Sequence, residues 1–194
     1  MYTPRLVSVC LFLVLSISAV GAEVSSEPGA KVQKTVNEVL SILTDESLSE
    51  SQKKEQAYRI VATQVNFTGM SRRILAINWN KATEEQKLEF EKQFKEVLLN
   101  TYWQRVKNYN NEKVEYITGM IEGNRFATVD TVIISDSIEI PITYRMELVD
   151  GEWMAYDFLI ESLSLVTRYR TDYRNKIKTL GIDGLLALMK KELI

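Results

Sequence analysis

Few of the side chains that carry enzymatic chemistry occur in this chain, and their absence narrows what it can do. Its 194 residues include no histidine and a single cysteine, Cys10. A Ser-His-Asp triad, a Cys-His nucleophile and a zinc site with nitrogen and sulfur ligands are therefore excluded. Catalysis would have to depend on Asp, Glu, Lys, Tyr or Arg. We therefore expect a protein that is not an enzyme and that holds no resident cofactor.

One acidic residue is nevertheless a candidate general base. Asp130 lies in a run of β-branched residues, and burial can raise the pKa of a carboxyl group towards the range that a base requires. A small-molecule, isomerase-like enzyme that uses Asp130 is thus the alternative interpretation. The segment Ser135–Ser137 permits a turn of two or three residues after this strand. We favour two, which places Asp130 on the outer face of the sheet, away from a pocket.

The first 22 residues have the parts of a secretory signal. Arg5 supplies a basic start, Leu6–Val20 is a nearly unbroken apolar run, and Val20-Gly21-Ala22 places small residues before a cleavage site. The apolar run is shorter than the roughly 20 residues that a transmembrane helix needs, so a membrane anchor is the weaker alternative. We expect cleavage after residue 22 and a single mature domain over residues 23–194.

The composition of that domain argues against further classes of protein, namely disulfide-stabilised and nucleic-acid-binding ones. Loss of residues 1–22 removes Cys10, Arg5 and no acidic residue, so the formal net charge changes from −2 to −3 and no disulfide can form. A chain of about 170 residues can bury roughly 70% of its unfolded surface, which is enough for stability from packing alone. The acidic balance argues against nucleic-acid binding, which requires a basic face. We expect a soluble periplasmic monomer.

The first half of the chain has the periodicity of helices. Pro28 suits a first helical turn, and apolar residues follow it at helical spacing. Ser49–Gln52 and Thr83–Gln86 match capping boxes, each of which opens a helix. After the middle of the chain, Gly181 ends one helix and Asp183 caps the last. The helices predicted in the first half cover residues 28–43, 49–65, 70–77 and 84–108.

The second half changes to the alternating pattern of strands. The clearest strand is Ile138–Leu148, where apolar residues occupy every second position. Pro141 lies within it and cannot donate a ladder hydrogen bond, which indicates an edge, a bulge or strong curvature. The predicted strands cover residues 114–118, 125–134, 138–148 and 152–161.

The hairpin between the last two strands has two possible registers. A two-residue loop would set Tyr144 opposite Asp157, whereas a three-residue loop, Val149–Gly151, pairs Tyr144 with Tyr156. We favour three residues, because apolar side chains then face each other. Asp157 would lie on the outer face, in a solvated pair diagonal to Arg145. The other predicted pairs are Ile142–Phe158 and Ile140–Ile160.

Two apolar surfaces would face each other in this arrangement, one on the longest helix and one on the sheet. The pattern alone permits a dry core or the wall of a pocket, because an amphipathic helix on a sheet has the same periodicity in both cases. The strand 127–133 has smaller inward side chains, which slightly favours a pocket.

Four segments in order carry a family resemblance. Trp79–Gln86 precedes apolar residues at helical spacing up to Tyr102, and Trp153–Asp157, Ile160–Arg170 and Gly181–Leu185 follow. Behind an export signal, this series resembles the MlaC family, periplasmic phospholipid shuttles also known as toluene-tolerance auxiliary proteins.

The resemblance implies a fold and a function. The fold is α+β: a helical first half wraps a curved antiparallel sheet of about four strands, similar in shape to nuclear-transport-factor-like folds, with C-terminal helices and an apolar pocket between helices and sheet. One phospholipid would be the cargo. The partners would be an outer-membrane lipoprotein–porin complex and an inner-membrane MCE-domain ABC transporter, so that the shuttle maintains outer-membrane lipid asymmetry. Ser162 departs from the family, which usually has glycine there.

We expect the cargo to contact apolar residues of the long helix, the strands and the following helix. These residues are Phe90, Phe94, Val97, Leu98, Tyr102, Val129, Ile133, Ile140, Ile142, Tyr144, Met146, Met154, Tyr156, Phe158, Ile160, Leu163 and Val166.

Overall fold

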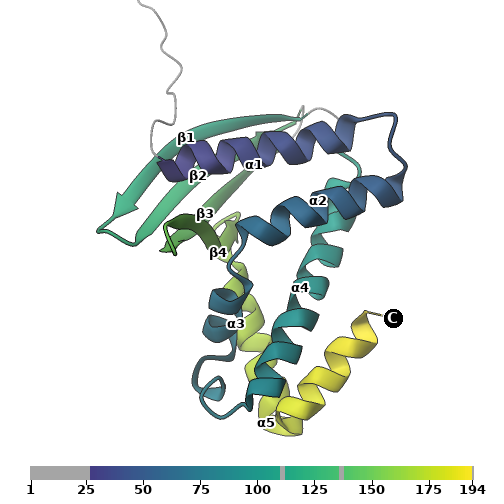
Figure 1. The fold of residues 1–194 in the computed structure, drawn as a ribbon, viewed down its shortest axis with the longest axis vertical. Helices are drawn as coiled ribbons and strands as arrows, with labels where there is room; N and C mark the ends of the chain where they lie inside the picture. The colour runs from purple at the N-terminus through teal and green to yellow at the C-terminus, as the bar shows by residue number, and fades with distance from the viewer. Residues whose placement is uncertain (1–26, 110–111, 136–137, 194) are drawn as a thin grey trace, which may run out of the picture.

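The fold is seen in a computed structural model that describes residues 27–109, 112–135 and 138–193 (Figure 1). The predicted signal segment lies outside the described residues. The elements are α1 (Glu27–Thr44), α2 (Glu50–Gln64), α3 (Phe67–Leu75), η1 (Ala76–Asn78), α4 (Glu84–Val106), β1 (Lys113–Glu122), β2 (Phe126–Ile134), β3 (Glu139–Val149), β4 (Glu152–Ile160), β5 (Leu163–Ser164) and α5 (Leu165–Glu192).

Both predicted capping boxes are present. The Ser49 and Thr83 hydroxyls accept hydrogen bonds from backbone N–H groups in the first turns of α2 and α4, and the Gln52 and Gln86 side chains accept from the cap residues in return. The short helix α3 begins three residues before its predicted start. Its first turn is capped by Asn66, whose side-chain oxygen accepts from the Gly69 N–H at 2.7 Å.

The five strands form one antiparallel sheet in the order β1-β2-β3-β4-β5. The predicted α+β class is therefore confirmed, with a two-residue fifth strand added to the expected four. The β2–β3 register pairs Ile134 with Glu139, and the Ser135 N–H donates to the Ile138 carbonyl at 3.0 Å. This is the two-residue register that the sequence favoured.

The register predicted for the β3–β4 hairpin is wrong. The loop has two residues, Asp150 and Gly151, both with positive φ (50° and 84°), which is the geometry that matches the twist of paired strands. A β-bulge at Tyr156 then shifts the register by one residue, so Tyr144 faces Phe158. Apolar pairing is thus achieved by the bulge and not by the loop. The observed apolar pairs are Tyr144–Phe158 and Ile142–Ile160.

The helices divide between the two ends of the molecule (Figure 1). α1 lies across β1 and β2, and α2 continues beside it, whereas α3, α4 and α5 extend away from the sheet. α5 is interrupted at Gly181 (φ 71°), as the sequence predicted, and its last part doubles back there. The Asp183 side chain accepts a hydrogen bond from the Gln86 amide at 2.6 Å. The main core joins α3, α4 and α5 to one edge of the sheet, and Met70, Phe90 and Phe94 are fully buried in it.

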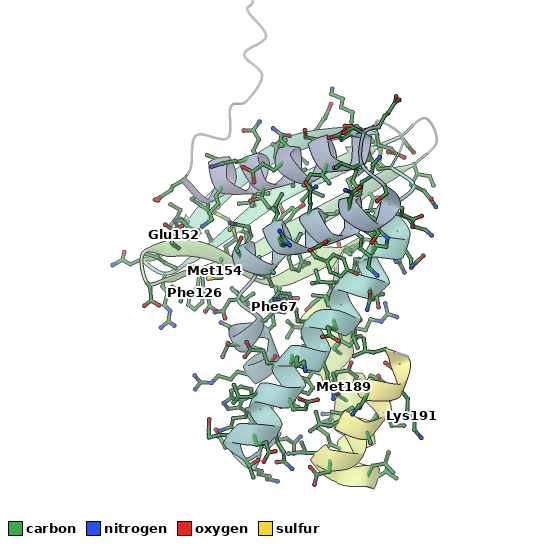
Figure 2. All side chains as sticks on the ribbon, turned by 45° about the vertical axis from the view of Figure 1, so that its right-hand side comes forward. Phe67, Phe126, Glu152, Met154, Met189 and Lys191 are labelled. Carbon is green, nitrogen blue, oxygen red and sulfur yellow. The ribbon has the colours of Figure 1, made fainter. Side chains whose placement is uncertain are left out.

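Buried charges join these helices to the outer face of the sheet. Glu147 is 3% exposed and its carboxylate accepts hydrogen bonds from the Arg73 guanidinium at 2.8 and 3.1 Å and from the Asn66 amide at 2.7 Å. Figure 2 shows Phe126 and Met154, which flank Glu147 on the neighbouring strands. Because a buried carboxylate is stable only when it is paired, this cluster fixes α3 against the sheet.

A second buried carboxylate, that of Asp157, accepts hydrogen bonds from the first turn of α5 and the residue before it. Asp157 accepts hydrogen bonds from the Val166 N–H at 3.0 Å and from the Ser164 hydroxyl at 2.7 Å, and it is 2% exposed. It therefore satisfies the first turn of the helix. The predicted pair with Arg145 is present, with 3.4 Å between the guanidinium and the carboxylate. Arg145 is directly opposite Asp157 and not diagonal to it, and the carboxylate is buried and not solvated as predicted.

The turn between β4 and β5 shows why glycine would be favoured at the position of Ser162. Glu161 and Ser162 both have positive φ (49° and 66°), a conformation that is strained for residues with a Cβ. Ser162→Gly should therefore raise the free energy of unfolding by about 0.5–1 kcal/mol, measured by urea denaturation. Ser162→Ala is the control and should have little effect, since it retains the Cβ. An equal gain from both substitutions would contradict this explanation.

Candidate binding cavity

An apolar cavity of about 690 Å³ lies between the inner face of the sheet and helices α1, α2 and α4. This volume is in the range of ligand-binding sites in proteins. The lining residues are Lys31, Val32, Thr35, Val36, Val39, Leu40, Leu43, Val61, Gln64, Val65, Leu98, Leu99, Tyr102, Arg105, Val106, Asn108, Tyr109, Glu112, Val114, Ile133, Ser135, Ile138, Ile140, Ile142, Tyr144, Met146, Ala155, Phe158, Ile160 and Leu165.

Strand alternation builds the floor of the cavity. Every inward residue of β3 from Ile140 to Met146 lines it, because side chains two positions apart point to the same face of a sheet. Phe158 and Ile160 of β4 join them only because the bulge has shifted the register. Burial raises the pKa of the Tyr144 phenol, and a hydrogen bond with Thr131 acts in the opposite direction. Burial thus favours the neutral form of the Tyr144 phenol.

The cavity has its mouth where α4 ends and the β2–β3 turn lies. Val106 and Ile138 line it there although their exposed fractions are 38% and 57%. Arg105 supplies a positive charge at the same end, with its guanidinium carbon 5.7 Å from the centre of the Tyr102 ring. The Tyr109 hydroxyl donates to the Glu112 carbonyl at 2.8 Å and fixes the chain beside the opening. The site thus has an apolar interior and a polar rim, to which Arg105 and Glu112 contribute opposite charges.

The structure brings about half of the predicted site residues together on this wall. Phe90 and Phe94 instead contact each other and the tyrosines of α5: Phe90 meets Tyr173 at 5.8 Å between ring centres, and Phe94 meets Tyr169 at 5.1 Å. The predicted residues on the wall are Leu98, Tyr102, Ile133, Ile140, Ile142, Tyr144, Met146, Phe158 and Ile160. Those elsewhere are Phe90, Phe94, Val97, Val129, Met154, Tyr156, Leu163 and Val166.

Four of the other displaced residues have a local reason. Met154 and Tyr156 lie on the outer face because the loop and the bulge set a different register, and the Arg73 guanidinium is 4.0 Å from the centre of the Tyr156 ring. Val166 is buried in the main core next to α3 and α4. Leu163 is 72% exposed, since the positive-φ turn before it directs its side chain to solvent.

The contribution of α1 to the cavity was not predicted from the sequence. This helix supplies Lys31, Val32, Thr35, Val36, Val39, Leu40 and Leu43 to the cavity. The signal was present, because the apolar residues of α1 recur at the same helical spacing as those of α4. Spacing identifies the buried face of a helix but not the element that covers it, so the sequence did not place α1 over the sheet.

Asp130, the candidate general base, lies outside the cavity. It pairs with Thr143, whose hydroxyl donates to the Asp130 carboxylate at 2.5 Å on the outer face of the sheet. This location removes the geometry on which the enzyme alternative depended. Within the described residues, no group of three or more Asp and Glu side chains is placed to hold a metal ion. No described helix is long and apolar enough to cross a membrane.

The arrangement of a helix-covered antiparallel sheet with an apolar cavity defines a class of small ligand-binding α+β proteins. The family model described as MlaC protein matches residues 33–191, so the chain belongs to the MlaC family. The predicted resemblance is therefore confirmed.

Individual relatives are distant in sequence. The toluene tolerance protein ttg2D of Pseudomonas putida is 24% identical over 127 residues, which are 64% of this chain and 59% of that protein. The intermembrane phospholipid transport system binding protein MlaC of Haemophilus influenzae is 26% identical over 132 residues, which are 66% and 62% of the two chains. The matched parts thus span about three fifths of these relatives.

A solved structure has the same fold. The phospholipid-binding protein from Ralstonia solanacearum, determined in complex with a phospholipid, superposes with a TM-score of 0.78 at 21% identity. The match covers 86% of this chain and 96% of that one, so the fold is shared over nearly its whole length.

Charge substitutions distinguish a cavity wall from a packed core. Ile142→Glu places a carboxylate where water can reach it, so the protein should stay folded and lose about 1–2 kcal/mol of stability. Ile74→Glu, the matched control, buries the same charge in the main core, where Ile74 is 2% exposed, and should abolish the cooperative melt. Circular dichroism melting measures both. Equal unfolding of the two variants would show that Ile142 is part of a dry core.

Proposed function

We propose that this protein is a periplasmic phospholipid carrier that encloses acyl chains in the cavity. The observation that carries the proposal is the apolar cavity of about 690 Å³, with Arg105 in its lining. Family membership and the phospholipid in the Ralstonia solanacearum structure support it. The predicted secretory signal supports the location.

The energetics of lipid in water explain why a carrier needs an enclosed site. Two acyl chains contain about 28 methylene groups, and exposing each to water costs about 0.8 kcal/mol, or on the order of 20 kcal/mol in all. Such a cost prevents free movement of phospholipid between membranes. A cavity walled by aliphatic and aromatic side chains removes most of it, and no catalytic group is required.

The polarity of the cavity gives the cargo an orientation. The apolar floor around Ile142 and Phe158 would take the acyl chains, and the headgroup would remain at the mouth near Arg105. A guanidinium can donate two parallel hydrogen bonds to a phosphate, which makes Arg105 the natural contact for the headgroup. The glycerol backbone would lie between Val106 and Ile138 at the rim.

Family membership supports a role in transport. The carrier would move phospholipid between an outer-membrane lipoprotein–porin complex and an inner-membrane MCE-domain ABC transporter, as a monomer. The Haemophilus influenzae relative is named as the binding protein of an intermembrane phospholipid transport system, which supports this assignment. A shuttle needs weak, reversible docking, which suits a moderately acidic surface.

Lipid occupancy tests the central claim. Protein purified from the periplasm should carry phospholipid in native mass spectrometry and release it on organic extraction. Ile142→Glu should give a soluble protein without lipid, because a carboxylate among the acyl chains would be desolvated when lipid binds. Wild-type protein that remains empty after incubation with phospholipid vesicles would refute the proposal.

The headgroup contact can be tested separately. Arg105→Ser should weaken binding of a lysophosphatidylglycerol by about fivefold, since an exposed charged hydrogen bond contributes about 1 kcal/mol. Binding of a monoacylglycerol, which lacks the phosphate, should not change. Arg59→Ser on α2 is the control, because Arg59 pairs with Glu55 and does not line the cavity. Equal loss for both ligands would assign Arg105 a packing role only.

A further inference from the structure

Helix α1 covers the cavity but is held mainly at its two ends. It supplies seven lining residues, yet its buried residues are confined to Pro28, Gly29 and Val32 near the start and Leu43 near the end. The middle of the helix, including Val36 and Val39, is only half-buried and faces the cavity. The cavity therefore reaches the underside of α1, where Val36 also packs against the sheet and Val39 against the cluster around Leu43.

The first turns of α1 are attached to the sheet by a small set of contacts. Val32 packs in a cluster with the inner face of the sheet and Trp153. Lys31 forms an ion pair with Glu152, with 2.6 Å between the ammonium nitrogen and a carboxylate oxygen. Figure 2 shows Glu152 at the hairpin end of the sheet, beside the first turns of α1. This pair, the α1 latch (Lys31 and Glu152), is accessible to solvent, since the Glu152 side chain is 73% exposed.

The other end of α1 is anchored in the helical part of the molecule. Leu43 packs with Ala57 of α2 and Trp103 of α4, and the Lys53 ammonium donates to the Leu43 carbonyl at 2.7 Å. A four-residue connection, 45–48, then leads to the Ser49 cap of α2. This end is thus joined to α2 through the chain as well as by packing.

The two ends of α1 therefore differ in the contacts that would be lost if each end separated from its neighbours. Among the described residues, none of α1 belongs to the buried main core of α3, α4 and α5. Separation of the first half of α1 from the sheet would break the α1 latch, the packing of Val32 and Val36 on the sheet, and a long 3.4 Å hydrogen bond from the Tyr116 hydroxyl to Asn37. It would leave the main core and the anchored end of the helix intact.

We propose that the first half of α1 is the gate of the cavity, closed by the α1 latch and moving relative to the end of the helix that Leu43 anchors. Opening it would expose the inner face of the sheet from the side, so that both acyl chains of a lipid enter together and need not pass lengthwise through the mouth beside Arg105. This inference rests on the proposed function, because it requires an acyl-chain cargo.

A reversible cross-link tests the gate. Lys31→Cys and Glu152→Cys are combined with Cys10→Ser, which removes the only natural cysteine, and are joined by a short bifunctional methanethiosulfonate. Uptake of a fluorescent lysophosphatidylethanolamine from monomeric solution is followed by its emission, so that no membrane or partner is needed. The cross-linked protein should take up the probe at least tenfold more slowly than the same protein after reduction with dithiothreitol.

The control joins two helices elsewhere. Thr68 of α3 donates to Glu91 of α4 at 2.8 Å, so Thr68→Cys and Glu91→Cys accept the same reagent without touching α1. This cross-link should leave the uptake rate unchanged. As a second measurement, Lys31→Glu should speed uptake through repulsion from Glu152, and Lys31→Glu with Glu152→Lys should restore the rate.

The outcomes separate the two proposals. If the protein cross-linked at the α1 latch takes up the probe as fast as its reduced form, the gate is refuted and the cargo enters by the mouth. If both cross-links slow uptake equally, the effect is general rigidity and the gate is likewise refuted. If wild-type protein itself never takes up the probe, the proposed function fails, and the gate fails with it.

Discussion

The β-bulge at Tyr156 is the constraint on which the site and the helical half both depend. A two-residue hairpin loop without it would set Asp157 opposite Tyr144, inside the cavity. With one extra residue in β4, Asp157 turns outward, where it accepts hydrogen bonds that begin α5, and Phe158 turns inward to face Tyr144. One irregularity thus removes a carboxylate from an apolar cavity and uses it to fix a helix.

The two faces of the sheet consequently have opposite chemistry. The outer face concentrates buried ionic contacts, among them Arg73 with Glu147, which tie α3 and α5 to the strands. The inner face is apolar and only partly covered. Ion pairs and hydrogen bonds, which require a specific geometry, therefore position the helices. The cavity wall instead offers apolar contacts, which have no directional requirement. A cargo of flexible acyl chains can be accommodated on such a wall without breaking the contacts that define the fold.

The sequence predicted features that depend on local signals and failed where tertiary context decides. Both capping boxes identified their helices, since Ser49 and Thr83 make the predicted bonds within one turn. The hairpin register was wrong because a bulge is an alternative way to pair apolar residues that alternation cannot detect. Phe90 and Phe94 were assigned to the cavity, since periodicity gives the inward face of α4 but not its partner there, which is α5. Where α4 approaches the sheet, the same periodicity correctly placed Leu98 and Tyr102 on the wall.

An empty cavity of this size would reduce the stability of the folded protein. Cavities left by mutation destabilise a folded protein in proportion to their volume, so an empty, dry space of about 690 Å³ would be strongly unfavourable. A domain has only about 5–15 kcal/mol of stability to offset such a cost. The space must therefore hold water or cargo, and cargo that replaces water on an apolar wall stabilises the folded state. The main core of α3, α4 and α5 shares only some residues with the cavity wall, among them Leu98, Leu99 and Leu165, and the packing of Phe90 and Phe94 lies away from the cavity. We therefore expect this core to keep the protein folded with or without cargo, as a carrier that binds and releases its cargo requires.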